Sequence, residues 1–207
     1  MQKETENSAY GTAGASGRLG REFFERDAVT VARALIGTTL VRQFRGTEYR
    51  ARIVETEAYV GAHDLACHAA KGRTARTETL YLSGGHAYVY FIYGMYSMLN
   101  VVTGVAEDPQ AVLIRAAEPV AGWNGGPPPD LSGPGKLCRA LHITRAQNGI
   151  DLTDDALHFL PATGPPPRII ATPRIGVDYA KEWKHELLRF LELGSSAVSK
   201  APRKGSA

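Results

Sequence analysis

The sequence predicts an α+β fold that contains more strand than helix. Short runs rich in valine, isoleucine, threonine and tyrosine recur along the chain, and turn-forming residues separate them. Glycine and proline account for 22 and 12 of the 207 residues, which indicates many turns and a few long loops. Strand and helix patterns do not alternate regularly, as they would in a doubly wound parallel sheet.

The expected elements follow from local signals. Asp27 is a suitable N-cap for a helix that continues to Leu35, and Gly37 provides its stop. A second short helix is expected over residues 136–143, and residues 63–70 are a candidate for a third. The strands expected from alternating or β-branched patterns are 38–44, 49–60, 86–93, 95–102, 110–116, 157–160, 168–171 and 187–193.

The chain length fits one domain with two tails. Residues 1–17 are polar and rich in glycine and alanine, and we expect a disordered tail there. Residues 18–193 are expected to form the domain, and residues 194–207 a flexible, basic tail. The Gly/Pro-rich stretch 122–135 could link two domains, but its flanks look too small to fold separately, so a surface loop is preferred.

Composition excludes several classes of protein. No window approaches the roughly 18 consecutive apolar residues of a membrane span, and the first residues lack the apolar centre of a secretory signal. Cys67 and Cys138 stand apart without a CxxC motif, so neither a disulfide scaffold nor an iron–sulfur site is expected. A reducing cytoplasm is therefore the expected location. The net charge of +3 only weakly favours a polyanionic partner.

The segment RIVETEAYV, residues 52–60, places two carboxylates beside a tyrosine. Because side chains alternate along a strand, Glu55, Glu57 and Tyr59 share a face with Ile53. The residues expected to pack inward are Val54, Thr56, Ala58 and Val60. The polar face either meets solvent or holds a carboxylate against an aromatic wall. There a carboxylate can deprotonate water or stabilise an oxocarbenium-like centre.

A cluster of tyrosines follows at Tyr88, Tyr90, Tyr93 and Tyr96. Tyr88 and Tyr90 share a strand face, and Tyr93 comes directly before Gly94, where the chain must turn. Such a pattern is typical of a half-buried sheet. It also fits a stacking platform for nucleobases, with an aromatic wedge at the hairpin tip that unstacks a base step.

Two basic features flank the tyrosines. Lys71, Arg73 and Arg76 occupy a loop without acidic residues between positions 71 and 77. This loop is either a solvated surface or a contact with phosphates. Residues 133–136 (GPGK) open a helix, where free backbone N–H groups bind anions and Lys136 adds positive charge. A simple loop-to-helix turn fits those residues as well.

His63 and Cys67 would face the same side of a helix and could hold zinc with ligands from elsewhere. No CxxC motif supports that reading, and the signature of zinc deaminases is absent, so no metal site is expected. His68 is expected to be a hydrogen-bonding residue in a pocket or in the core.

Five segments, in this order, resemble the alkyladenine (3-methyladenine) DNA glycosylase family. They are RIVETEAYVGAHDLACH (52–68), YVYFIYGMYSMLNVV (88–102), AVLIRAAEPVAG (111–122), GPGKLCRALHI (133–143) and RIGVDYAKEW (174–183). Together they span nearly all of residues 18–193. The resemblance implies a single mixed domain around a curved, mainly antiparallel sheet flanked by short helices. It also implies that no metal or organic cofactor is needed.

The resemblance assigns a role to each matching residue. Glu57 would be the catalytic base, Arg115 would lie beside the attacking water, and Tyr93 would insert into the duplex. The residues implied to form the base pocket are Tyr59, His68, Tyr90 and Asn100, the last of which would crowd out normal purine amino groups. The residues implied to contact the DNA backbone are Arg73, Arg76 and Lys136. Glu55 is the competing carboxylate for the role of base.

The implied function is that of a monofunctional DNA repair glycosylase. Such an enzyme flips alkylated purines out of duplex DNA, hydrolyses the N-glycosylic bond and leaves an abasic site. Release of deaminated or etheno purines is left open. The expected partner is double-stranded DNA with damaged purines, bound by a monomer in the cytoplasm (at the nucleoid) or the nucleus and not at a membrane. Two alternatives remain: a small-molecule nucleoside N-hydrolase and a non-catalytic nucleic-acid-binding module.

One segment departs from the family pattern. In the loop over residues 73–87, only Arg73, Thr74 and Arg76 match well. The contact of this loop with the DNA backbone is therefore the least defined part of the expected site.

Overall fold

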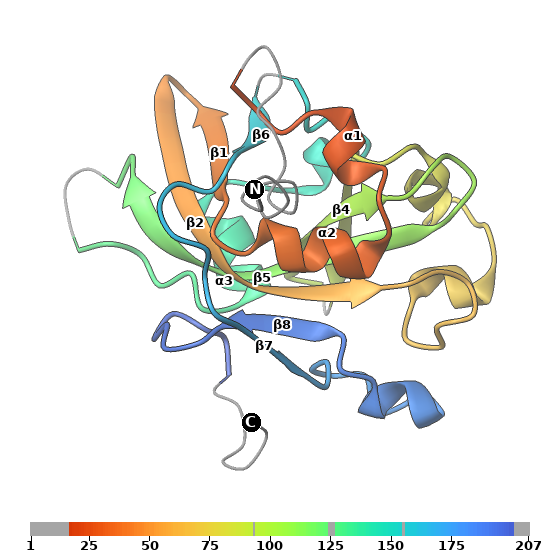
Figure 1. The fold of residues 1–207 in the computed structure, drawn as a ribbon. Helices are drawn as coiled ribbons and strands as arrows, with labels where there is room; N and C mark the ends of the chain where they lie inside the picture. Colours follow the sequence, from red (N-terminus) through yellow and green to blue (C-terminus); the bar gives the residue numbers. More distant parts are fainter. Residues whose placement is uncertain (1–16, 93, 124–126, 155, 201–207) are drawn as a thin grey trace, which may run out of the picture.

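The computed structural model describes residues 17–92, 94–123, 127–154 and 156–200, and Figure 1 shows their arrangement. These residues form an eight-stranded, curled antiparallel sheet with the path β3-β4-β5-β2-β1-β6, to which β8 pairs through β2 and β7 through β8. The strands are β1 (Thr39–Phe44), β2 (Thr47–Tyr59), β3 (Ala87–Ile92), β4 (Tyr96–Thr103), β5 (Gln110–Ala121), β6 (Leu157–Leu160), β7 (Ile169–Thr172) and β8 (Arg189–Glu192). The predicted α+β class and the curved antiparallel sheet are confirmed.

Short helices join and cover the strands. In the described part of the chain these are α1 (Arg21–Phe24), α2 (Ala28–Leu35) and α3 (Pro134–Ala140), with 3-10 helices at His68–Lys71, Glu78–Tyr81, Arg145–Gln147 and Lys181–His185. The predicted cap of α2 is confirmed, because the Asp27 side chain accepts a hydrogen bond from the N–H of Thr30 at 2.9 Å. The helix expected over 63–70 is wrong. Hydrogen-bonded turns occupy its first half instead, such as the bond from Cys67 N to Asp64 O.

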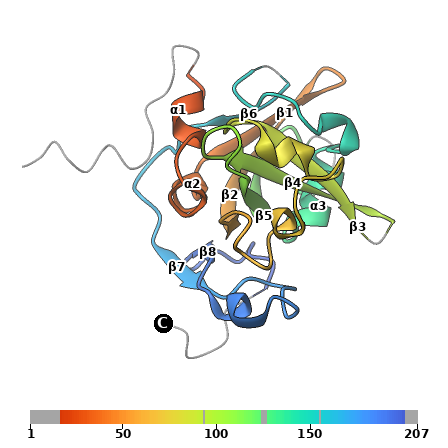
Figure 2. The same ribbon diagram turned by 90° about the vertical axis from the view of Figure 1, so that its right-hand side faces the viewer.

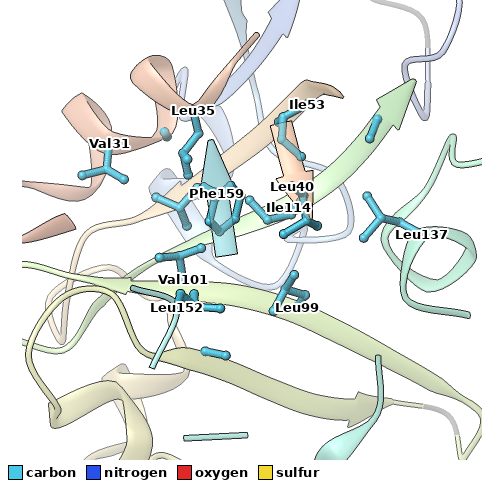
Figure 3. Close-up of a cluster of buried hydrophobic side chains, with 14 of the residues drawn as sticks. Val31, Leu35, Leu40, Ile53, Leu99, Val101, Ile114, Leu137, Leu152 and Phe159 are labelled. Carbon is cyan, nitrogen blue, oxygen red and sulfur yellow. The ribbon is translucent and has the colours of Figure 1, made fainter. Parts of the chain in front are cut away.

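The core lies on the face of the sheet that α2 covers. Val31 and Leu35 of α2 belong to one buried cluster with side chains of the sheet and with Leu137 of α3, and Figure 3 shows Phe159 of β6 near its centre. Phe159 is fully buried. The cross-strand neighbours on this face include Leu99, Val101 and Ile114. This apolar cluster covers one face of the sheet and shields it from solvent. The opposite face of the sheet lies outside the core.

A β-bulge in β2 changes which side chains share a face. The pairing of β2 with β5 shifts between Ile53 and Glu55 and again between Glu55 and Thr56. Ile53 therefore packs in the same core cluster as Ala58, although strict alternation placed it with the carboxylates. The expectation for Ile53 is wrong for this reason. Glu55 and Glu57 still lie away from the core cluster, one on each side of Thr56.

In the hairpin of β7 and β8, strand β8 pairs with β2 at Glu55, Thr56 and Glu57, beyond the residues of β2 that pair with β1. Figure 1 shows this hairpin in the lower part of the molecule, in blue. Figure 2 shows the hairpin of β3 and β4 extending toward the lower right of that view. Gly94 turns this second hairpin with a φ of +66°, as the sequence predicts for that position. No helix in the described ranges is both long and apolar enough to cross a lipid bilayer.

Candidate active site

A cavity of about 280 Å³ opens on the face of the sheet opposite the core. Its lining includes five of the residues that the sequence points to, namely Tyr59, His68, Tyr90, Asn100 and Arg115. These residues come from β2, β3, β4 and β5 and from the 3-10 helix at His68–Lys71. The segment 175–177 and Tyr179, between β7 and β8, close another side of the cavity.

Strand register explains why these side chains meet. Tyr88 pairs with Asn100, Asn100 with Leu113, and Leu113 with Glu57, across β3, β4, β5 and β2. Directly paired residues project from the same face of a sheet. One row therefore runs from the aromatic side of the cavity to the carboxylate of Glu57. The neighbouring row places Tyr59 opposite Ala111.

Glu57 lies directly behind the cavity wall and is fully buried. Its Oε1 accepts a hydrogen bond from the N–H of Ile175 at 2.8 Å. Its Oε2 accepts bonds from the hydroxyl of Tyr59 at 3.0 Å and from Arg115 Nη1 at 3.3 Å. All three donors belong to residues that line the cavity. Three donors on one buried carboxylate fix its direction.

Glu55 is held by a different set of partners. Its Oε1 accepts bonds from Arg115 Nε and Arg189 Nε, each at 2.8 Å. Burial would raise the pKa of Glu55, but the bond from Arg189 and the charges of Arg115 and Arg189 outweigh it and lower that pKa. Of these partners only Arg115 lines the cavity. The geometry therefore favours Glu57 over Glu55 as the carboxylate that serves the cavity.

A second buried ion pair supports the wall formed by Tyr59. Arg174 donates to Asp64 through Nη1 at 2.5 Å and Nη2 at 2.8 Å, and neither side chain is exposed to solvent. The guanidinium carbon of Arg174 lies 4.8 Å from the centre of the Tyr59 ring. Since Ile175 follows Arg174, this ion pair also anchors the N–H group that binds Glu57.

His68 and two tyrosines form the aromatic side of the cavity. The ring centre of His68 lies 4.5 Å from that of Tyr90, and its Nδ1 is 2.9 Å from the hydroxyl of Tyr88. Burial, with the charges of Arg76 and Lys71, lowers the pKa of His68 to about 4. His68 is therefore neutral at pH 7. It adds an aromatic ring and a polar nitrogen to the site without adding charge.

Asn100 is buried on β4, and its amide Nδ2 donates to the carbonyls of Tyr88 at 3.2 Å and Met98 at 3.4 Å. These bonds tie the side chain to the sheet. The amide is therefore a fixed part of the cavity surface, and its position cannot adjust freely to a ligand.

The expected DNA contacts lie outside the cavity. Arg73 is exposed and pairs with Glu78 and Glu107, and exposed Lys136 pairs with Asp130. The guanidinium carbon of Arg76 lies 5.8 Å from the Tyr90 ring centre, so this residue borders the site. Tyr93 lies outside the described residues.

The residues suggested for zinc have other partners. His63 packs edge-on against Trp183, with ring centres 5.4 Å apart. Cys67 is buried, and burial raises the pKa of its thiol to about 11. Among the described residues, no three His, Cys, Asp or Glu side chains gather where they could hold a metal ion.

Several contributors to the site were missed by reasoning from the sequence. Asp64, Arg174, Ile175 and Arg189 hold the carboxylates and the aromatic wall in place, as described above. Asp64 and Arg174 both lie in segments that carry the family resemblance, which was the available signal. No spacing rule connects two residues 110 positions apart in the sequence.

The fold and the site define a protein with an aromatic-lined cavity on one face of an antiparallel sheet, beside a fixed, buried carboxylate. Comparison with known proteins identifies the family. The family model for methylpurine-DNA glycosylase matches residues 22–196. The chain belongs to that family and is a DNA glycosylase, so its substrate is DNA.

Similar proteins cover nearly the whole chain. A protein of Myxococcus xanthus is 50% identical over 188 residues, which cover 90% of this chain and 96% of the relative. A protein of Methanocella arvoryzae is 48% identical, with 88% and 96% covered. One from Legionella pneumophila (strain Corby) is 45% identical, with 88% and 98% covered. Each carries the name "Putative 3-methyladenine DNA glycosylase".

Proposed function

We propose that this protein excises alkylated purines, such as 3-methyladenine, from duplex DNA by hydrolysing the N-glycosylic bond. The observation that carries the proposal is the position of the Glu57 carboxylate, directly behind an aromatic cavity of about 280 Å³. Small-molecule sites commonly measure about 300–1,000 Å³. A cavity just below that range suits a single base better than a whole nucleotide.

The base reaches the cavity by leaving the helical stack. Flipping costs a few kcal/mol, and less for a base whose pairing is already weakened. The hairpin of β3 and β4 projects from the body of the protein, beside the cavity that Tyr90 lines (Figure 2). In our proposal Tyr93, which directly precedes Gly94 in the sequence, fills the space that the flipped base leaves. Arg73, Arg76 and Lys136 contact the DNA backbone, so Arg73 and Lys136 must exchange their present carboxylate partners for phosphates.

The cavity walls favour a purine that carries positive charge. Tyr59 and Tyr90 present aromatic rings, and cation–π contacts contribute about 0.5–2 kcal/mol each. His68 is neutral, since its pKa is about 4. Asp64 neutralises Arg174 behind the Tyr59 ring. Neither His68 nor the Arg174–Asp64 pair therefore adds net positive charge that would oppose these contacts. Asn100 lies where it can contact the edge of the purine.

Glu57 and Arg115 carry the chemistry. The water oxygen forms a bond to the sugar C1′ as the bond from C1′ to the base nitrogen breaks. The electron pair of the broken bond leaves with the base. Glu57 accepts a proton from the water and offsets the positive charge that develops on the sugar. At 3.3 Å, the bond from Arg115 to Glu57 is the longest of the three on this carboxylate. Water entering from the cavity replaces this contact in our proposal, and Arg115 then orients the water.

The reaction stops at the abasic site. A lyase step would require an amine that forms a Schiff base with the sugar. Within the described residues, the lining of the cavity contains no lysine. This composition supports a monofunctional enzyme. We further propose that it acts as a monomer, in the compartment that holds the DNA.

The test is product analysis with purified protein. A duplex with one 3-methyladenine, or the more stable ethenoadenine, is incubated with enzyme, and released base and strand breaks are measured. We expect free base and breaks that appear only after alkali treatment. Breaks without alkali would refute the monofunctional assignment. Equally rapid cleavage of the free alkylated nucleoside would indicate a small-molecule hydrolase, and binding without release would indicate a non-catalytic module.

A further inference from the structure

The chain returns to the active site after β8. Residues 194–200 were expected to belong to a flexible tail, yet Ser195 Oγ donates to Glu118 at 2.8 Å and Ser199 reaches Glu55. The N–H of Ser199 donates to Glu55 Oε2 at 2.5 Å, and its hydroxyl donates to Glu55 Oε1 at 2.7 Å. The carbonyl of the next residue, Lys200, accepts a bond from Arg189 Nη2 at 2.5 Å.

These contacts complete the surroundings of a buried charge. Glu55 is fully buried, and its Oε1 is shared by Arg115, Arg189 and the Ser199 hydroxyl. For Oε2, the bond that the structure gives is the one from the N–H of Ser199. Without this segment, one oxygen of a buried carboxylate would lose that donor. A buried charged group in that condition reorients or admits water.

Arg115 connects Glu55 and Ser199 to the cavity. Its Nε donates to Glu55 at 2.8 Å, its Nη1 to Glu57 at 3.3 Å, and its Nη2 to the Ser199 hydroxyl at 3.1 Å. A guanidinium is rigid and planar, so contacts at three different nitrogens fix both its position and the direction of its plane. Two of these three contacts depend on Ser199, either directly or through Glu55.

We propose that Ser199 is a positioning residue, which fixes Glu55 and Arg115 and thereby keeps the guanidinium of Arg115 beside the carboxylate of Glu57, where both groups can reach the water. This role rests on the proposed function, in which Arg115 and Glu57 act on the water. Ser199 does not line the cavity, so it acts through these two residues and not by touching the base. The segment that contains Ser199 and Lys200 therefore affects the rate of base release more than the affinity for the substrate.

Two shortened chains separate this role from that of the tail as a whole. A chain that ends at Val198 loses Ser199 and Lys200, whereas a chain that ends at Lys200 keeps both and loses only residues 201–207. Base release is measured under single-turnover conditions on the lesion duplex, beside the dissociation constant. For the chain ending at Val198 we expect release to slow by about 10- to 100-fold, as for a misplaced catalytic group. Its dissociation constant should stay within about threefold of the full chain. The chain ending at Lys200 should match the full chain in both.

Point variants test the same role in a full-length chain. Ser199→Ala removes the hydroxyl contacts with Glu55 and Arg115 but keeps the N–H, so release should slow less than in the chain ending at Val198. Ser199→Thr retains a hydroxyl and should restore release to near the wild-type rate. Because these variants keep the whole chain, they remain informative if the chain ending at Val198 fails to fold.

The proposal is overturned if the chain ending at Val198 folds and releases base at the full rate. It is also overturned if affinity falls in parallel with the rate, or if Ser199→Ala and Ser199→Thr are equally slow. Failure of the proposed function would look different, because the full-length wild type would then release no base. Release by the wild type with no effect of Ser199 would refute the positioning role alone.

Discussion

Replacing Asp64 by asparagine should destabilise the protein strongly, because it removes one charge of a fully buried pair. The Asp64 carboxylate accepts two bonds from Arg174, one from the N–H of Val60 at 3.3 Å and one from the N–H of Ala66 at 3.0 Å. Asparagine keeps one acceptor oxygen and turns an NH2 group toward these donors. The guanidinium of Arg174 is then left buried without a counter-charge.

Breaking a buried ion pair by removing one partner costs about 3–5 kcal/mol. For a domain of this size, each kcal/mol lowers the melting temperature by about 2–4 °C, so we expect a fall of roughly 6–20 °C. Urea denaturation gives the free energy of unfolding, and scanning calorimetry gives the melting temperature. Glu78→Gln is the matched control, because it also removes a carboxylate from an arginine, but in an exposed pair. The control should leave the melting temperature nearly unchanged. A free energy of unfolding for Asp64→Asn within about 1 kcal/mol of wild type would refute the reasoning.

Three further predictions concern the aromatic wall, acid stability and backbone packing. Tyr90→Leu should weaken binding of a lesion duplex by about 1–3 kcal/mol, the value of one base–aromatic stack, whereas Tyr90→Phe should not. Fluorescence anisotropy measures the affinity of both variants, and equal affinities of the two would count against stacking on Tyr90. Since the pKa of His68 falls from 6.5 to about 4 on folding, the unfolded chain binds more protons between these values, and stability is lost as pH falls through that window. Urea denaturation should show about 2 kcal/mol of this loss between pH 7.5 and pH 5, and His68→Gln should show a correspondingly smaller loss; an unchanged loss would exclude His68 as its source. Gly84→Ala would place a Cβ against the carbonyl oxygen of Phe24, closer than two such atoms can pack, so we expect a loss of about 1–3 kcal/mol in the same assay. Wild-type stability would show that the backbone there shifts at no cost.

The elements that local chemistry decides could be predicted from the sequence. Asp27 has the side chain that an N-cap needs, and α2 begins directly after it. Gly94 permits the positive φ that turns the hairpin of β3 and β4. The alternation in residues 88–92 placed Tyr88 and Tyr90 on one face, and both line the cavity. In each case the deciding residues are neighbours in the chain.

The features that were predicted wrongly or missed depend on contacts between segments that are distant in the sequence. Ile53 changed faces because of a bulge against β5, which no pattern within β2 shows. Arg174 meets Asp64 only after the hairpin of β7 and β8 pairs with β2. Ser199 lies in a stretch whose composition resembles that of a solvated tail, and its partners are buried side chains on β2 and β5. The composition of a segment indicates the structure that the segment prefers in isolation. It does not show which surface of the folded domain the segment packs against.

The assignment of Glu57 as the base is tested most directly by Glu57→Gln. This change keeps the size of the side chain and removes its charge, while Tyr59 and Ile175 retain partners on it. Base release from a duplex with one ethenoadenine is measured under single-turnover conditions, beside the dissociation constant, with Glu55→Gln as the companion variant. We expect Glu57→Gln to bind the lesion duplex and to release no detectable base. Glu55→Gln loosens Arg115 but leaves the Glu57 carboxylate in place, so it should still release base, at a reduced rate, if it folds. Release by Glu57→Gln at a rate near that of the wild type would contradict the assignment.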